Sequence, residues 1–272
     1  MKVVLFCGGA GMRLRGYFDD IPKPMVCIGT RPILWHLMKY YAHFGHKDFV
    51  LCLGYKGDVI KDYFLNYDES KSNDFIWSNG GKKIEFLNRD SDDWRITFVE
   101  TGANALIGER LKAVEPHVRN EEMFLANYSD GLSDVNVNVM IDALRATDAV
   151  GSLLLVQPTA SFDIVRTSAT GTVSEISALS DSDIWINGGF FVLRGEIFQF
   201  MNDGEELVRQ PFERLIKRGA LLAHKCTGFW QCMDTFKDKQ RLEELNHEKR
   251  PPWKVWSDTA VSAPLAPLAN VA

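Results

Sequence analysis

Short apolar runs alternate along the chain with longer segments in which apolar side chains recur every three or four positions. The runs at 3–7, 48–53, 123–128, 151–156, 186–193 and 221–225 predict strands, several of them buried on both faces. The segments 30–45, 57–66, 104–118, 135–146, 196–202, 204–218 and 237–247 predict helices. This alternation predicts an α/β fold with a doubly wound, mostly parallel (Rossmann-like) sheet, whose ligands bind at the carboxyl ends of the strands.

The regular alternation breaks between Tyr67 and Thr101. Polar turns there separate short apolar pieces at 83–87 and 96–99, which predict antiparallel strands projecting from the main sheet. The alternative is a surface excursion without a partner. Residues 257–272 are small and rich in proline and alanine, which predicts a disordered tail. We therefore expect a single domain over 1–256 with an inserted antiparallel β region at about 67–101.

Composition excludes several classes of protein. Apolar residues make up 46% of the chain, enough for a core, yet no run has the length of a membrane span. The net charge is −5 without a lysine and arginine stripe, so we expect neither a nucleic acid nor a membrane partner. The start MKVVLF leads directly into a strand, and the five cysteines are scattered without a CxxC pair. We expect no signal peptide, free thiols and a cytoplasmic protein.

A glycine turn follows the first strand. Gly8, Gly9 and Gly11 let backbone amides approach a ligand closely, and Arg13 comes directly after them. Lys23 stands between two prolines, which fix its backbone and exclude a helix around it. Together these groups predict a polyphosphate site, although the spacing fits neither GxxxxGK[ST] nor GxGxxG. The alternative is a glycine turn with a chance arginine.

One carboxylate lies where a metal ion would be useful. Asp130 follows the strand at 123–128, and a carboxylate at such a strand end is well placed to hold Mg²⁺ beside phosphates. The alternative is a cap for the following segment. His36, His43 and His46 lie on or near the helix at 30–45, but they lack a tight ligand spacing, and we expect no metal site there.

The segments GGAGMRL and PKPM resemble the signature of the sugar-1-phosphate nucleotidyltransferases. The resemblance extends over about residues 1–256, through SDGLSD, INGGFFVL, GFWQCMDT and PPWKVW, and it is strongest to the glucose-1-phosphate cytidylyltransferases. It implies a nucleotidyltransferase that transfers a CMP group from CTP to a phosphorylated acceptor, releases pyrophosphate and uses Mg²⁺. It also implies a homo-oligomer with contacts through the insertion.

The resemblance also implies roles for individual residues. Arg13 and Lys23 are the expected catalytic cations, Asp130 and Asp234 the metal ligands, and Asn187 faces the sugar. Ser129 stands where the family has a glycine. The expected nucleotide-binding residues are Gly8, Gly9, Gly11, Met12, Arg13, Lys23, Thr101, Arg110 and Asp130.

The acceptor motifs depart from the family pattern. Where the family has Glu-Lys-Pro, this chain has Ser177, Ala178 and Leu179, and the preceding Arg-Phe-Gly stretch is altered at 160–164. We interpret this as a remodelled acceptor pocket. An acceptor phosphate still requires a cation, and Arg166, on an expected hairpin around Gly171, is one candidate. The alternative is that Arg166 is merely solvent-exposed on that hairpin.

Two classes of function follow. The first is a cytidylyltransferase, which acts either on a sugar-1-phosphate or on a non-hexose phosphorylated acceptor. The second is a nucleotide-binding subunit without turnover. Retention of Arg13, Lys23, Asp130 and Asp234 favours the enzyme, because a sensor has little use for a complete pair of metal-binding carboxylates.

Overall fold

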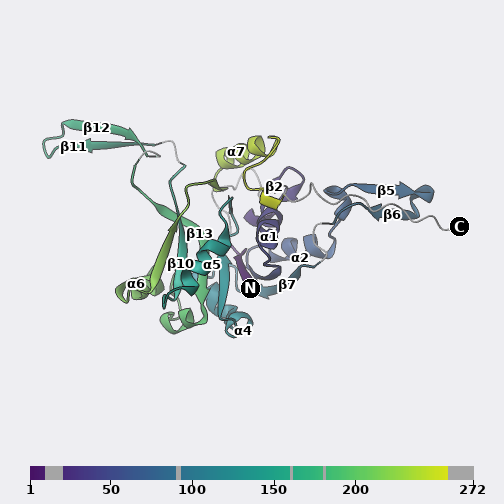
Figure 1. Cartoon of the computed structure of the whole chain (residues 1–272), viewed down its shortest axis with the longest axis horizontal. Helices are drawn as coiled ribbons and strands as arrows, with labels where there is room; N and C mark the ends of the chain where they lie inside the picture. Colours follow the sequence, from purple (N-terminus) through teal and green to yellow (C-terminus); the bar gives the residue numbers. More distant parts are fainter. Residues whose placement is uncertain (10–20, 90–92, 160–161, 180–181, 257–272) are drawn as a thin grey trace.

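The computed structural model describes residues 1–9, 21–89, 93–159, 162–179 and 182–256. Within these ranges the central element is a seven-stranded sheet of order β14-β10-β13-β8-β1-β4-β7 (Figure 1). Its strands are β1 (Lys2–Phe6), β4 (Asp48–Leu53), β7 (Arg95–Glu100), β8 (Met123–Asn127), β10 (Gly151–Val156), β13 (Ile186–Arg194) and β14 (Leu221–Lys225). Neighbours run parallel except that β13 is antiparallel to both β10 and β8. The predicted α/β, mostly parallel sheet is confirmed.

Helices cover both faces of this sheet, which is why its strands read as continuous apolar runs. In β1, Val3 and Leu5 join one buried cluster, whereas Val4 and Phe6 join the other. The first cluster includes side chains of α1 (Ile33–His43), α2 (Gly57–Leu65), α5 (Val137–Arg145) and α7 (Phe236–Asn246). The second includes side chains of α3 (Ile107–Ala113), α4 (Glu115–Val118) and α6 (Gln210–Lys217). No helix in the described ranges is both long enough and apolar enough to span a membrane.

Two hairpins project from the sheet on opposite sides (Figure 1). One pairs β5 (Phe75–Ser78) with β6 (Lys83–Phe86), and the other pairs β11 (Asp163–Thr167) with β12 (Val173–Ala178). The first hairpin lies in the expected insertion. The prediction that 96–99 also projects was wrong, because β7 pairs in parallel with β4 at the sheet edge. Its side chains pack on both sides, Phe98 against the first cluster and Val99 against the second.

Several predicted helices are shorter or broken. The segment expected as one helix at 104–118 divides into α3 and α4 at Val114, and Pro116 occupies the first turn of α4. A proline lacks the N–H that would continue the ladder from α3. Residues 195–200 form a 3₁₀ helix, and of the predicted segment 204–218 only α6 is α-helical. The prolines around Lys23 do not exclude all helix, since Lys23–Met25 form one 3₁₀ turn.

Two short strand pairs lie beside the carboxyl ends of the parallel strands. One joins β2 (Cys27–Ile28) to β3 (Arg31–Pro32), directly after the Lys23 turn. The other joins β9 (Gly131–Ser133) to β15 (Trp230–Cys232). These pairs bring segments that are distant in sequence to the edge where α/β proteins bind their ligands. The segment 257–272, expected as a tail, lies outside the described residues.

Candidate active site

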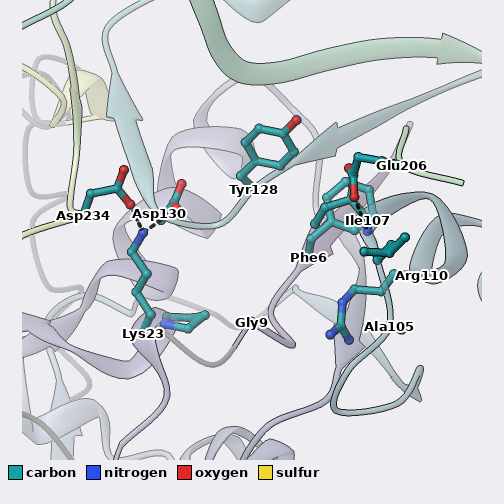
Figure 2. A pocket seen from close by; sticks show the side chains of 12 residues that line it. Phe6, Gly9, Lys23, Ala105, Ile107, Arg110, Tyr128, Asp130, Glu206 and Asp234 are labelled. Atoms are coloured by element: carbon teal, nitrogen blue, oxygen red, sulfur yellow. Dashed lines mark hydrogen bonds and ion pairs between the residues drawn. The ribbon is translucent and has the colours of Figure 1, made fainter. Parts of the chain in front are cut away.

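A cavity of about 520 Å³ opens at the carboxyl ends of β1 and β8. Lys23, Asp130 and Asp234 lie on one side of it in Figure 2, and Ile107, Arg110 and Glu206 lie on the other. Tyr128 and Gly9 lie between the two groups (Figure 2). The cavity therefore has a charged side, formed by a lysine and two carboxylates, and a second side built around the start of α3.

Lys23 joins the two carboxylates. Its Nζ lies 2.6 Å from Oδ2 of Asp130 and donates a second hydrogen bond to Oδ1 of Asp234. The carboxylates meet because β9 and β15 pair side by side, with the backbone N–H of Met233 donating to the Asp130 carbonyl at 2.8 Å. The strand pair thus brings together Asp130 and Asp234, the two residues that the resemblance implied as metal ligands.

Charge and burial act against each other here. Burial alone would lower the pKa of Lys23, but Asp130 and then Asp234 outweigh it and raise that pKa above its ordinary value. Burial raises the pKa of Asp130, while Lys23 opposes this rise. The ammonium is therefore firmly charged near neutral pH, and the two carboxylates share a single cation.

The two carboxylates fit a divalent metal ion. Since both reach one ammonium nitrogen, both can reach one cation, and hard carboxylate oxygens suit Mg²⁺. Among the described residues no group of three or more His, Cys, Asp or Glu side chains could hold a metal. Any further ligands would then be water or substrate phosphate, which is how Mg²⁺ is commonly held in phosphoryl-transfer sites.

Arg110 supports the glycine turn. Its side chain is almost completely buried, at 2% exposure. The guanidinium donates to Oγ1 of Thr101 at 2.8 Å, to the Gly102 carbonyl at 2.9 Å and to the Gly8 carbonyl at 3.1 Å. Thr101 in turn donates to the Leu53 carbonyl at 2.7 Å. Arg110 and Thr101, both expected to bind nucleotide, thus fix the backbone beside the cavity.

Position 8 must be glycine because the Arg110 side chain occupies the space that a Cβ would need. A Cβ at Gly8 would lie 1.9 Å from Nη1 of Arg110, so no larger residue fits without displacing the guanidinium. Gly9 lines the cavity itself. Gly11, Met12 and Arg13, expected in the nucleotide site, lie outside the described residues.

Ser129 occupies a position that favours glycine. Its φ of +67° lies in the left-handed region, which costs a non-glycine residue about 1–2 kcal/mol. Its backbone N–H donates to Oδ1 of Asn127 at 2.8 Å, and its hydroxyl lies 3.5 Å from Sγ of Cys7. The serine therefore keeps the turn that aims Asp130 at Lys23.

Asn187, which we expected to face the sugar, contacts the cavity residue Tyr128. Nδ2 of Asn187 lies 3.1 Å from the Tyr128 hydroxyl, and its Oδ1 accepts from the N–H of Gly189 at 2.9 Å. Burial raises the pKa of Tyr128, which keeps the phenol neutral. A Cβ at Gly189 would lie 2.7 Å from the Tyr128 ring. This glycine therefore allows the tyrosine to lie against β13.

The structure does not bring Arg166 to the cavity. Arg166 lies on the projecting β11–β12 hairpin, with its Nε 3.2 Å from Oε2 of Glu175. Both side chains are more than half exposed, at 68% and 53%. Ser177 and Ala178, at the altered motif, pair with Ile164 and Asp163 near the base of the same hairpin.

Two polar residues that line the cavity, Tyr128 and Glu206, were not identified from the sequence. Glu206 lines the cavity, and its Oε2 accepts from the backbone N–H of Ile107 at 3.2 Å, at the start of α3. Tyr128 lines it from the end of β8. Glu206 comes from a segment whose only sequence signal was a helical pattern, and Tyr128 read as one more apolar strand residue.

Comparisons with known proteins add independent information. No protein-family model matches the chain. Over 258 residues it is 39% identical to the glucose-1-phosphate cytidylyltransferase of Salmonella typhi, covering 94% of this chain and 100% of that protein. Over 233 residues it is 27% identical to the D-glycero-α-D-manno-heptose 1-phosphate guanylyltransferase of Campylobacter jejuni, covering 81% and 90%. The crystal structure of HddC from Yersinia pseudotuberculosis superposes on this chain with a TM-score of 0.63. The match covers 89% of this chain and 98% of that one at 20% sequence identity, so it shows a similar fold and nothing more.

We predict that Arg110→Met destabilises the protein by about 1–3 kcal/mol, because buried carbonyls beside the cavity lose their donor. Lys112→Met is the matched control on the same helix. Lys112 is ion-paired to the 97%-exposed Asp203, and its loss should change the free energy of unfolding by less than about 0.5 kcal/mol. Urea denaturation followed by circular dichroism measures both. Equal effects of the two variants would contradict the supporting role of Arg110.

Proposed function

Since the chain belongs to the glucose-1-phosphate cytidylyltransferase family, we propose that its cavity transfers a CMP group from CTP to a phosphorylated acceptor and releases pyrophosphate. The resemblance expected from the sequence motifs is confirmed by this relationship. One observation carries the proposal for the site: Lys23 lies between Asp130 and Asp234 on the wall of a cavity at the carboxyl edge of the sheet.

The chemistry asks the protein mainly for position and charge. An acceptor phosphate oxygen attacks the α-phosphorus of the triphosphate, and the bond to the pyrophosphate leaving group breaks in line with it. Two anions repel as they approach, so cations must lie between them. Lys23 supplies one such charge at a fixed place, because its turn is set by Pro22 and Pro24 and its ammonium by two carboxylates.

The carboxylates supply the second part of the site. We propose that Asp130 and Asp234 hold a divalent ion, Mg²⁺ in this protein, which when bound neutralises phosphate charge. Arg110 contributes by fixing the Gly8 carbonyl, which holds the glycine turn beside the phosphates. Tyr128 and Asn187 form the side that faces the acceptor. No side chain is required as a nucleophile in this scheme.

A second candidate concerns the acceptor. Ser177, Ala178 and Leu179 stand where the family has Glu-Lys-Pro, so this chain lacks the lysine of that motif. This replacement favours a different phosphorylated acceptor, including a non-hexose one. Lys225 offers a replacement cation. Lys225 on β14 is the register partner of Leu155 on β10, and Leu155 is also the register partner of Asn187 on β13. Lys225 and Asn187 therefore lie at the same level of the sheet, separated only by β10.

Two broader properties complete the proposal. We propose a homo-oligomer with contacts through the β5–β6 hairpin, where Ile76 and Trp77 are 48% and 63% exposed. Light scattering of the wild type against Trp77→Glu would test this, and a monomeric wild type would contradict it.

We also propose a cytoplasmic protein, because all five cysteines are free thiols.

Turnover is the direct test of the proposed function. The protein should release pyrophosphate when CTP, glucose-1-phosphate or another phosphorylated acceptor, and Mg²⁺ are present together, and other nucleoside triphosphates should be poorer donors. A coupled pyrophosphate assay over a panel of acceptors measures this. Tight CTP binding without turnover on any acceptor would instead indicate a nucleotide-binding subunit.

We predict that Asp130→Asn and Asp234→Asn each lower kcat by about 100-fold or more, since each removes half of the charge that holds the metal. The melting temperature should stay within a few degrees, because the remaining carboxylate still pairs with Lys23. Asp142→Asn, an exposed change on α5, is the control and should retain normal kcat. A large loss of melting temperature in the first two variants would point to a structural role for these carboxylates.

The acceptor hypothesis predicts that Lys225→Met lowers kcat/KM for the acceptor about tenfold or more, which is about 1.4 kcal/mol or more of transition-state stabilisation. Lys217→Met removes an exposed charge from α6 and should have no such effect. Restoring Glu, Lys and Pro at positions 177–179 should raise turnover of glucose-1-phosphate. Efficient use of glucose-1-phosphate by the wild type would show that the acceptor pocket is not remodelled.

A further inference from the structure

A second cavity, of about 730 Å³, lies apart from the site described above. It is bordered by the β2–β3 turn, α1, the segment 70–74 and the residues that follow α7. Five cationic side chains line it: Arg31, Lys39, Lys71, Arg89 and Lys254. Among the described residues that line it, Asp74 is the single carboxylate. Five cations therefore face one carboxylate, in a chain whose net charge is −5.

Arg31 is the most informative of these cations. It is only 2% exposed, and all the hydrogen bonds of its guanidinium to described residues go to uncharged groups. Nε lies 3.0 Å from the Ser72 hydroxyl, Nη1 3.2 Å from the Tyr63 hydroxyl and Nη2 2.9 Å from the Asp68 carbonyl. The Asp68 carboxylate is engaged elsewhere, since its Oδ1 accepts from the N–H and hydroxyl of Ser70.

Within the described part of the chain the hydrogen bonds of Arg31 go to two hydroxyl groups and one carbonyl, and none goes to a carboxylate. A buried charge without a paired carboxylate is costly, and among the described residues the Asp68 carboxylate acts on Arg31 through its charge without a hydrogen bond to it. An anion in the adjoining cavity would supply that counter-charge. The placement of Arg31 thus points to a ligand rather than to an internal ion pair.

The cavity also has aromatic walls. Trp35 and Trp256 line it, with their rings 6.1 Å apart and nearly perpendicular. Cζ of Arg31 lies 5.6 Å and Nζ of Lys39 lies 5.8 Å from the centroid of the Trp35 ring. Burial lowers the pKa of Lys254, an effect that a bound anion would reverse. Cations beside indole rings suit an anion that carries a planar ring as well as charge.

We propose that this second cavity binds a phosphorylated small molecule, with Arg31, Lys71 and Arg89 holding its phosphates and Trp35 and Trp256 contacting any base that it carries. The excess of positive charge matches a diphosphate better than a singly charged anion. Two sources share this chemistry, inorganic pyrophosphate and a nucleoside diphosphate. The inference concerns binding and does not rest on turnover in the first cavity.

The test is the stoichiometry of binding to the full chain. Isothermal titration with CDP and, separately, with inorganic pyrophosphate should show two equivalents bound by the wild type, one in each cavity. Lys71→Ala/Arg89→Ala changes two exposed side chains of the second cavity and should weaken one equivalent at least tenfold. Lys23→Ala should weaken the other.

Lys82→Ala/Lys83→Ala is the matched control, because it removes the same charge from exposed positions of the same insertion without bordering the cavity. It should leave both equivalents within twofold of wild type. Tighter binding of CDP than of pyrophosphate identifies a nucleotide ligand, and equal binding identifies the phosphates as the recognised group. No binding to the wild type, a single equivalent that Lys23→Ala weakens, or equal weakening by both double variants would overturn the proposal. A single equivalent that only Lys71→Ala/Arg89→Ala weakens would support it.

Discussion

The contact of Lys23 with Asp130 and Asp234 is the interaction on which the rest of the site depends. It joins three segments: the 3₁₀ turn that begins at Lys23, the segment after β8 and the segment after β15. Burial acts to lower the pKa of Lys23 and to raise that of Asp130, and the contact between the two side chains opposes both effects. The attraction between the ammonium and the two carboxylates holds the three side chains together at the wall of the cavity.

The opposite side of the cavity is built by hydrogen bonds to the backbone. The buried Arg110 draws together the Gly8 turn, the end of β4 and the turn after β7, so the glycine turn is fixed from behind. This division explains the two kinds of sequence constraint. Lys23, Asp130 and Asp234 are needed for their charge, whereas Gly8 and Gly189 are needed because another side chain occupies the space of a Cβ.

Much of the fold follows from the sequence, because strands buried on both faces leave unmistakable apolar runs. The bounds of β4, β10 and β14 match their predicted ranges. β7 was misassigned, since half-buried edge residues such as Ile96 resemble those of a projecting strand. Tertiary contacts decide the parts of the site that the sequence did not predict. Glu206 carries no local sequence signal for its place beside Ile107. Arg166 is near the acceptor motif in sequence, yet in the structure it pairs with Glu175 on a projecting hairpin. The excess of positive charge around Arg31 could not be predicted from the sequence, because its cations lie far apart along the chain, at 31–39, 71–89 and 254, and meet only in the fold.

The central claim is that Asp130 and Asp234 hold one divalent ion together when the nucleotide is bound. Crystals of the full chain grown with CTP and Mn²⁺, a substitute for Mg²⁺ with a measurable anomalous signal, test it directly. The account predicts an anomalous peak in contact with both carboxylates, and Lys23 Nζ turned from them to a phosphate oxygen. A peak that contacts neither carboxylate, with Lys23 still bonded to both, would contradict it.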